Sequence, residues 1–218
     1  MNRAEAYSHK VLDVRDVTSS VFVIRMARNG LLFKTGQHIN VGPADAGYTR
    51  EYSIYSGEDD PFLEVLIKEV VPDGFVSPLL RQVKPGDEVM VEPPMGYFSL
   101  PDEVNSKMLF IATGTGISPY HSFIRSHPAI NYHLVHGIRD ISEVCELASY
   151  DRTRVDICTS QSREGDFYGR VTKWLGQNDL TDYKHVFLCG NRNMINEARD
   201  ILLARGFSSG QIHAEAYF

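Results

Sequence analysis

Cysteine is scarce in this 218-residue chain, which contains only Cys145, Cys158 and Cys189. None of their spacings is that of a zinc or iron–sulfur site, and no two histidines stand at ligand spacing beside a carboxylate. A sparse, odd cysteine count is typical of proteins from a reducing compartment. The sequence therefore predicts reduced thiols, no metal site and a cytoplasmic location.

Long apolar runs and an excess of basic charge are also missing. No run approaches the length of a membrane span, and no apolar segment follows the N-terminal residues, so we expect neither a span nor a signal peptide. Lys and Arg number 22 against 28 Asp and Glu, and the first 104 residues hold 10 and 16 of these. Nucleic-acid binding needs a basic surface. We therefore expect neither nucleic acid nor a membrane as a partner.

The first half of the chain contains short β-branched and aromatic runs bounded by Gly, Pro and Asp. This pattern is typical of antiparallel strands in a small barrel. The expected strands cover residues 10–17, 21–26, 37–41, 51–55, 62–70 and 88–91. The sequence predicts a Greek-key β-barrel for this half.

The second half alternates short, fully apolar runs with segments of helical pattern. The runs are residues 108–112, 132–135, 155–157 and 186–188, and the helical segments are 117–126, 141–149, 169–175 and 193–204. Apolar strands alternating with helices indicate a Rossmann-like parallel sheet covered on both faces. We expect two domains, residues 1–104 and 105–218, with the boundary near 101–107.

Two segments of the expected barrel carry groups suited to a nucleotide. On a strand, Arg50 and Tyr52 share one face and Ser53 takes the other; an Arg can pair with phosphate and a Tyr ring can lie on a flat heterocycle. Ser77 stands in the first turn of a short helix expected from Phe75, where N–H groups also suit phosphate. The alternatives are an edge strand with a surface Arg and a half-buried Tyr, which a motif this short favours, and a capped surface helix.

Two further segments end strands of the expected parallel sheet. Residues 113–116 form a Gly-rich turn between a strand and a helix, the setting of a dinucleotide-phosphate loop, although the sequence is not G-x-G-x-x-G. Cys189-Gly190 ends a later strand, at the edge where such sheets collect ligands, and Asn191 suits a helix N-cap. A plain connection and a buried structural cysteine are the alternatives.

Taken together and in this order, the motifs resemble those of the ferredoxin–NADP reductase superfamily, and most closely its compact bacterial ferredoxin/flavodoxin–NADP reductases. The resemblance covers nearly the whole chain. It rests on F-x-x-G-Q at 33–37, R-x-Y-S at 50–53, G-x-x-S at 74–77, P-x-G-x-F at 94–98, G-T-G-x-x-P at 114–119 and C-G at 189–190.

The resemblance implies an enzyme with FAD and NADP(H) as cofactors and no metal. The FAD-binding residues would be Arg50, Glu51, Tyr52, Ser53, Leu66, Ile67, Gly74, Phe75, Val76, Ser77, Thr115 and Phe218. The NADP-binding residues would be Gly114, Thr115, Gly116, Ser160, Arg163, Cys189, Gly190 and Asn191. The residues at the site of hydride transfer would be Ser53, Cys189, Glu215 and Phe218, with the Phe218 ring covering the flavin.

The function implied is electron transfer between NADPH and ferredoxin or flavodoxin, by hydride transfer to flavin N5 and then one-electron steps. Docking would be transient and electrostatic, and we expect a monomer. The candidate docking residues are Arg3, Lys10, Arg25, Arg28 and Lys34. An NADH-dependent oxygenase reductase component and a free NAD(P)H:acceptor reductase remain open, since their fold and flavin would be the same and only the acceptor differs. NAD also remains open beside NADP, because Gln161 interrupts the usual Ser-Arg of the 2′-phosphate pocket. A non-catalytic flavin-binding module is the alternative from another class.

Overall fold

The computed structural model describes residues 7–101 and 106–217. The chain divides into two compact units, one comprising Met1–Ser99 with His121–Ser126 and the other Leu100–Tyr120 with His127–Phe218. The predicted boundary after residue 104 falls within 102–105, outside the described residues, and stays a prediction.

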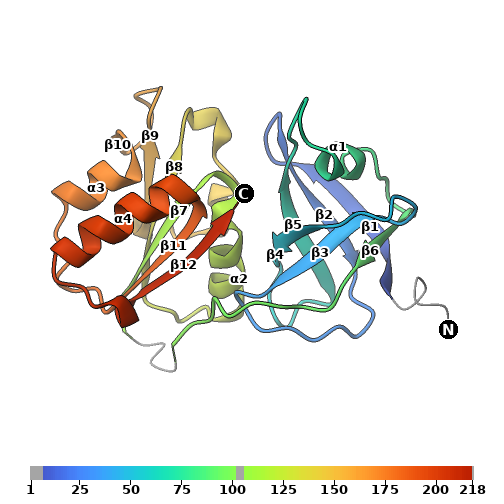
Figure 1. Ribbon diagram of the computed structural model, residues 1–218, viewed down its shortest axis with the longest axis horizontal. Coiled ribbons are helices and arrows are strands. Elements are labelled where there is room, and N and C mark those ends of the chain that lie inside the picture. The colour runs from blue at the N-terminus through green and yellow to red at the C-terminus, as the bar shows by residue number, and fades with distance from the viewer. Residues whose placement is uncertain (1–6, 102–105, 218) are drawn as a thin grey trace. The chain divides into compact units, whose positions relative to one another are not determined.

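The first unit is built on six antiparallel strands (Figure 1). Along the sheet the order is β4 (Arg50–Ser53), β3 (His38–Pro43), β6 (Glu88–Val91), β1 (Ser8–Asp16), β2 (Val21–Ala27) and β5 (Phe62–Lys68). An isolated bridge between Ile54 and Val65 joins the two outer strands and closes the sheet on itself. The predicted antiparallel barrel is confirmed.

Alternating side chains fill the interior of this barrel, as the period of two in a strand requires. On β2, Phe22, Ile24 and Met26 belong to the core cluster. One short helix, α1 (Val76–Leu80), adds Val76 and Leu80 to the same core. Burial of these apolar side chains therefore fixes the position of α1 on the barrel.

The second unit contains a sheet of six parallel strands. The order is β10 (Phe167–Tyr168), β9 (Val155–Thr159), β8 (Tyr132–Ile138), β7 (Met108–Thr113), β11 (His185–Asn191) and β12 (Ile212–Tyr217). The chain leaves β7 toward β8 on one side and later returns to pair β11 on the other. The carboxyl ends of β7 and β11 therefore form the topological switch point, where open parallel sheets bind ligands.

Helices cover both faces of this sheet. α3 (Val171–Gln177) and α4 (Arg192–Ala204) lie side by side on one face, where they bury Leu109 and Leu188 (Figure 1). On the opposite face Tyr120, near the start of α2 (Ser118–Ser126), stacks on Phe110 with ring centroids 4.7 Å apart. The predicted Rossmann-like α/β sheet is confirmed.

Two details differ from the sequence prediction. The helix expected over 141–149 is wrong: this segment forms two 3-10 turns, Ile141–Glu143 and Leu147–Ser149. They are separated by extended backbone at Val144, and Glu146 adopts a left-handed φ of 40° that interrupts any helix. The strands β10 and β12 were not predicted, because neither is a continuous apolar run of the kind used to find buried strands.

Candidate cofactor-binding sites

Strand β4 carries the first group of predicted residues. Tyr52 is half-buried and packs against the barrel core, and this burial raises its pKa to about 12 despite the Arg50 charge. Ser53 points to the other side and is buried. Arg50 is exposed, and its guanidinium donates a hydrogen bond to the carbonyl oxygen of the adjacent Thr49 at 3.3 Å. The strand thus offers a cation and a supported ring.

The start of α1 carries the second group. The N-cap residue, Phe75, makes no side-chain hydrogen bond to the helix, so the first-turn N–H groups receive no side-chain cap. The Ser77 hydroxyl accepts the Val70 N–H at 3.1 Å, which leaves its own proton for another acceptor. A β-carbon at Gly74 would lie 2.2 Å from the Val70 carbonyl oxygen, so only glycine fits there. These donors suit a phosphate group.

An aromatic contact brings the two groups together. The rings of Tyr48 and Phe75 meet edge to face, with centroids 5.0 Å apart and planes at 83°. Tyr48 lies two residues before Arg50, and Phe75 two residues before Ser77. The exposed guanidinium and the hydroxyl donor are therefore held in one region of the first unit, an arrangement that fits the pyrophosphate of FAD.

The other predicted FAD-binding residues of this unit present fewer side-chain groups that could contact a cofactor. Glu51 is exposed on β4. Leu66 and Ile67 of β5 are 3% and 0% exposed, so any contact they make with a cofactor must come from their backbone. Val76 is buried in the core and contributes only its N–H.

In the second unit, the carboxyl ends of β7 and β11 pack closely against each other at the switch point. Gly190 has a φ of 125°, and a β-carbon there would lie 2.3 Å from Thr113 Oγ1. The Asn191 N–H donates to that same oxygen at 2.9 Å. The Asn191 side chain accepts the N–H groups of Asn193 and Met194, which confirms its position as the N-cap of α4. Thr113 thus links the two predicted ligand-binding segments.

The Gly-rich turn forms a 3-10 helix, η2 (Gly114–Ile117). Gly114 takes a left-handed φ of 54°. The Nε2 atom of His136, in β8, lies 2.9 Å from the Gly114 carbonyl oxygen and so carries the proton. His136 Nδ1 is buried without a partner among the described residues, and burial lowers the pKa of this histidine to about 4. Sequence analysis missed this residue, since a histidine in an apolar strand signals no contact with a distant turn.

Cys189 and Glu215 occupy paired positions on β11 and β12. The thiol is fully buried, and its pKa lies well above the usual value, chiefly because of burial and then because of the Glu215 charge. Tyr217 hydrogen-bonds to the thiol and was not predicted. Glu215 itself is half-buried. Phe218, the predicted flavin cover, lies outside the described residues.

Ser160 and Arg163 follow the carboxyl end of β9. Arg163 is exposed, and its guanidinium lies over the ring of Tyr168, 4.8 Å from the centroid. Tyr168 is 48% exposed and pairs with Thr159 on the neighbouring strand. Sequence analysis did not identify Tyr168. A cation beside an exposed ring at this sheet edge can contact both a phosphate and a base.

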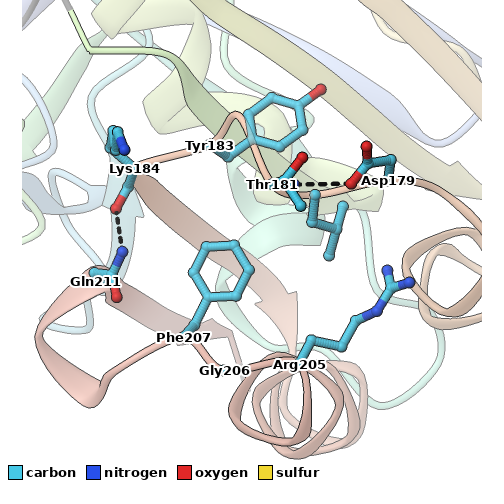
Figure 2. Close-up of a pocket in the computed structure, with 9 residues that line it drawn as sticks. Asp179, Thr181, Tyr183, Lys184, Arg205, Gly206, Phe207 and Gln211 are labelled. Atoms are coloured by element: carbon cyan, nitrogen blue, oxygen red, sulfur yellow. Dashed lines mark hydrogen bonds between the residues drawn. The ribbon is translucent and has the colours of Figure 1, made fainter.

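A pocket of about 270 Å³ lies beside the amino ends of β11 and β12, away from the predicted site residues (Figure 2). Lys184 and Gln211, which precede β11 and β12, line it, and a hydrogen bond joins the Gln211 side chain to the Lys184 carbonyl oxygen. The rings of Tyr183 and Phe207 border the same hollow. None of the predicted site residues belongs to it.

The candidate docking residues are less available than their charges suggest. Arg25 pairs with the buried Glu64, and Arg28 donates to the carbonyl oxygens of three residues. Lys34 remains 81% exposed but contacts Glu58 at 3.0 Å. Lys10 is exposed, and Arg3 lies outside the described residues. Part of this basic charge is therefore neutralised within the barrel.

Comparison with known proteins agrees with a flavin site in the first unit and a nicotinamide-nucleotide site in the second. Residues 8–100 match the oxidoreductase FAD-binding domain family, and residues 110–200 match the oxidoreductase NAD-binding domain family. A flavodoxin/ferredoxin–NADP reductase of Escherichia coli K12 is 31% identical over 222 residues, which cover 90% of this chain and 89% of that protein. The chain belongs to the ferredoxin–NADP reductase superfamily.

Other members of the superfamily are similar as well. A ferredoxin–NADP reductase of Pseudomonas aeruginosa is 33% identical over 176 residues, covering 77% of this chain and 65% of that protein. The fold matches a ferredoxin–NADP reductase of Neisseria gonorrhoeae with a TM-score of 0.85 and 22% identity, covering 97% and 98% of the two chains.

These matches confirm three predictions: the reductase superfamily, an oxidoreductase activity, and FAD and a nicotinamide dinucleotide as cofactors. The donors and rings described above fit both groups. No helix among residues 7–101 and 106–217 is long and apolar enough to cross a membrane. Within those ranges, no group of three or more His, Cys, Asp or Glu side chains is arranged to hold a metal ion.

Proposed function

We propose that this reductase transfers electrons between NADPH and a ferredoxin or flavodoxin. The packing of Thr113 against Gly190 and Asn191 supports the nucleotide site most directly, because it joins the two turns proposed to bind NADPH. The similarity to the flavodoxin/ferredoxin–NADP reductase of Escherichia coli supports the acceptor. FAD supplies the exchange between two-electron hydride chemistry and one-electron transfer. The protein supplies binding, orientation and charge.

In the flavin domain, proposed to comprise residues 1–104, Arg50 and Ser77 bind the pyrophosphate. Tyr52 supports the isoalloxazine, because its ring is held by the barrel core. Ser53 orients the reacting edge of the flavin. A buried hydroxyl of this kind has little freedom and so can hold a hydrogen bond in a fixed direction.

In the nucleotide domain, proposed to comprise residues 105–218, the turn at 114–116 binds the dinucleotide phosphates. Cys189 and Glu215 shape the nicotinamide pocket and hold neighbouring positions on β11 and β12. The Cys189 thiol keeps its proton at neutral pH because its pKa is raised, so it acts as a small polarizable contact and carries no charge.

NADP is proposed over NAD because of the Arg163–Tyr168 pair. The 2′-phosphate adds negative charge that an exposed guanidinium can bind, and the Tyr168 ring supplies a face for adenine. Ser160, just after β9, adds a hydroxyl at the same edge. Gln161 and Ser162 separate Ser160 from Arg163 in sequence, but this spacing does not prevent the contact between Arg163 and the Tyr168 ring.

A second acceptor class has its own support. A glycine betaine monooxygenase reductase subunit of Chromohalobacter salexigens is 25% identical over 206 residues, covering 85% of this chain and 56% of that protein. The partial neutralisation of the docking residues also weakens the argument for a strongly acidic partner. An oxygenase reductase component is therefore the alternative function.

Titration of the purified protein under argon tests the proposal. NADPH should bleach the bound-flavin absorption band at a far lower concentration than NADH does, and the reduced protein should then reduce ferredoxin or flavodoxin. Equal or better bleaching by NADH, with electrons delivered only to an oxygenase, would establish the alternative. A protein that takes up no FAD would refute both.

A further inference from the structure

Tyr48 and Phe75 are two large aromatic residues whose side chains are mostly exposed to solvent. Tyr48 is 58% exposed and Phe75 57% exposed, although their rings contact each other edge to face. More than half of the surface of each ring therefore stays accessible to solvent, and these faces are available to a ligand. Such a ligand must be able to pack against a flat ring.

The position of Tyr48 is set by the backbone. A β-carbon at Gly42 of β3 would lie 1.9 Å from the Tyr48 carbonyl oxygen, so the two backbones are in close contact. Val41, the residue before Gly42, pairs with Arg50 of β4. Tyr48 is therefore held against β3, two residues before the paired part of β4 begins.

Arg50 and Tyr52 share one face of β4, and Tyr48 precedes the strand by two residues. In the proposed function, Tyr52 supports the flavin ring and Arg50 binds the pyrophosphate. The next part of FAD beyond the pyrophosphate is the adenosine, and the nearest aromatic side chain before Arg50 in the sequence is Tyr48. The Tyr48 ring contacts Phe75, which lies two residues before Ser77 in the other segment proposed to bind the pyrophosphate.

We propose that the Tyr48–Phe75 pair receives the adenine ring of FAD and thereby selects FAD over FMN. The proposal rests on the proposed function, since it assumes that this unit binds a flavin. Adenine has a π-face that stacks on aromatic side chains regardless of its hydrogen-bonding groups. FMN lacks the adenylate and so gains nothing from the pair.

Affinity of the apoprotein for FAD and FMN, measured in parallel by flavin fluorescence or calorimetry, tests this assignment. Tyr48→Leu and Phe75→Leu should each weaken FAD binding by about tenfold, the order expected for loss of one stacking face, and leave the affinity for FMN within about twofold. Tyr48→Phe keeps the ring and should bind FAD as the wild type does. Tyr97→Leu removes a fully exposed tyrosine of the same unit and serves as the control.

Each result has one meaning. Loss of FAD affinity with unchanged FMN affinity supports the assignment, and preserved binding by Tyr48→Phe strengthens it. Equal weakening of FAD and FMN would overturn it, because the pair would then only support the phosphate site. Unchanged affinity for both would also overturn it and leave the rings free for another protein. Failure of the wild-type protein to bind either flavin would refute the proposed function itself, independently of the variants.

Discussion

Gly116 lies directly against the backbone of Cys189, 73 positions further along the chain. A β-carbon added to Gly116 would stand 2.4 Å from the Cys189 carbonyl oxygen and 2.8 Å from the Gly190 Cα atom. The two turns proposed to bind the nicotinamide nucleotide are therefore packed on each other, and a change in one displaces the other.

Replacing Gly116 with Ala should therefore damage both stability and nucleotide binding. The added methyl group meets backbone atoms that cannot rotate away, so we expect a loss of about 1–3 kcal/mol in the free energy of unfolding. The KM for NADPH should rise, while FAD content stays unchanged. Thermal denaturation and steady-state kinetics measure these effects.

Gly176 provides the matched control for this substitution. It lies in α3, and a β-carbon there would meet nothing within 4 Å. Gly176→Ala should be neutral or stabilising by up to about 1 kcal/mol, because alanine favours the helix. If both variants behaved alike, the close packing at Gly116 would not be the cause.

His136 should make folding stability sensitive to mild acid. Its pKa is about 4 in the folded protein, against 6.5 for an ordinary histidine, because burial disfavours the charged form. Between these values the unfolded chain binds a proton that the folded chain does not, so stability falls as pH decreases from about 6.5 to about 4. The full shift corresponds to about 3 kcal/mol.

The variant His136→Gln isolates this contribution. Its amide can still donate to the Gly114 carbonyl oxygen but does not titrate. Urea denaturation at several pH values should show a smaller loss of stability below pH 6.5 in the variant than in the wild type. Parallel pH profiles for the two proteins would argue that carboxylates such as Glu58, whose pKa is lowered in the fold, account for all of the acid sensitivity.

Removing Arg163 should reduce discrimination between NADPH and NADH. Arg163→Ala loses the guanidinium proposed to bind the 2′-phosphate, so KM for NADPH should rise by about tenfold or more, while KM for NADH changes little. Flavin reduction measured with both nucleotides gives the comparison. Lys184→Ala, which removes a positive charge from the opposite edge of the sheet, should leave both KM values in place. An equal rise for both nucleotides in Arg163→Ala would reject the assignment.

The three cysteines should resist thiol reagents in the native protein. All are buried, burial raises the pKa of Cys158 to about 12, and Cys189 also lies well above its usual range. Since the thiolate is the reactive form, alkylation at pH 8 followed by mass spectrometry should find little modification until denaturant is added. Rapid labelling of Cys189 in the native protein would show that its surroundings open readily.

Much of this architecture follows from local patterns. β-Branched runs bounded by Gly, Pro and Asp are typical of strands, and they predict the barrel. The continuous apolar runs of the second unit predict parallel strands, because a strand that is apolar on both sides must be buried on both faces of its sheet. Asn191 was identified as a helix cap for the same reason, since capping depends on neighbours two and three residues away. The helix predicted for residues 141–149 is wrong because the apolar spacing there is that of a helix, whereas Asp140 and Glu146 favour turns.

The sequence by itself determined the two fold classes, the order of the motifs and the superfamily, because strand period, turn chemistry and motif spacing are local properties. Only the tertiary structure decided that Tyr48 meets Phe75, that His136 holds Gly114, and that Glu215 stands beside Cys189. These pairs depend on strand register and on crossover connections. A shift of one residue in register turns a side chain to the opposite face, so no local pattern can determine such contacts.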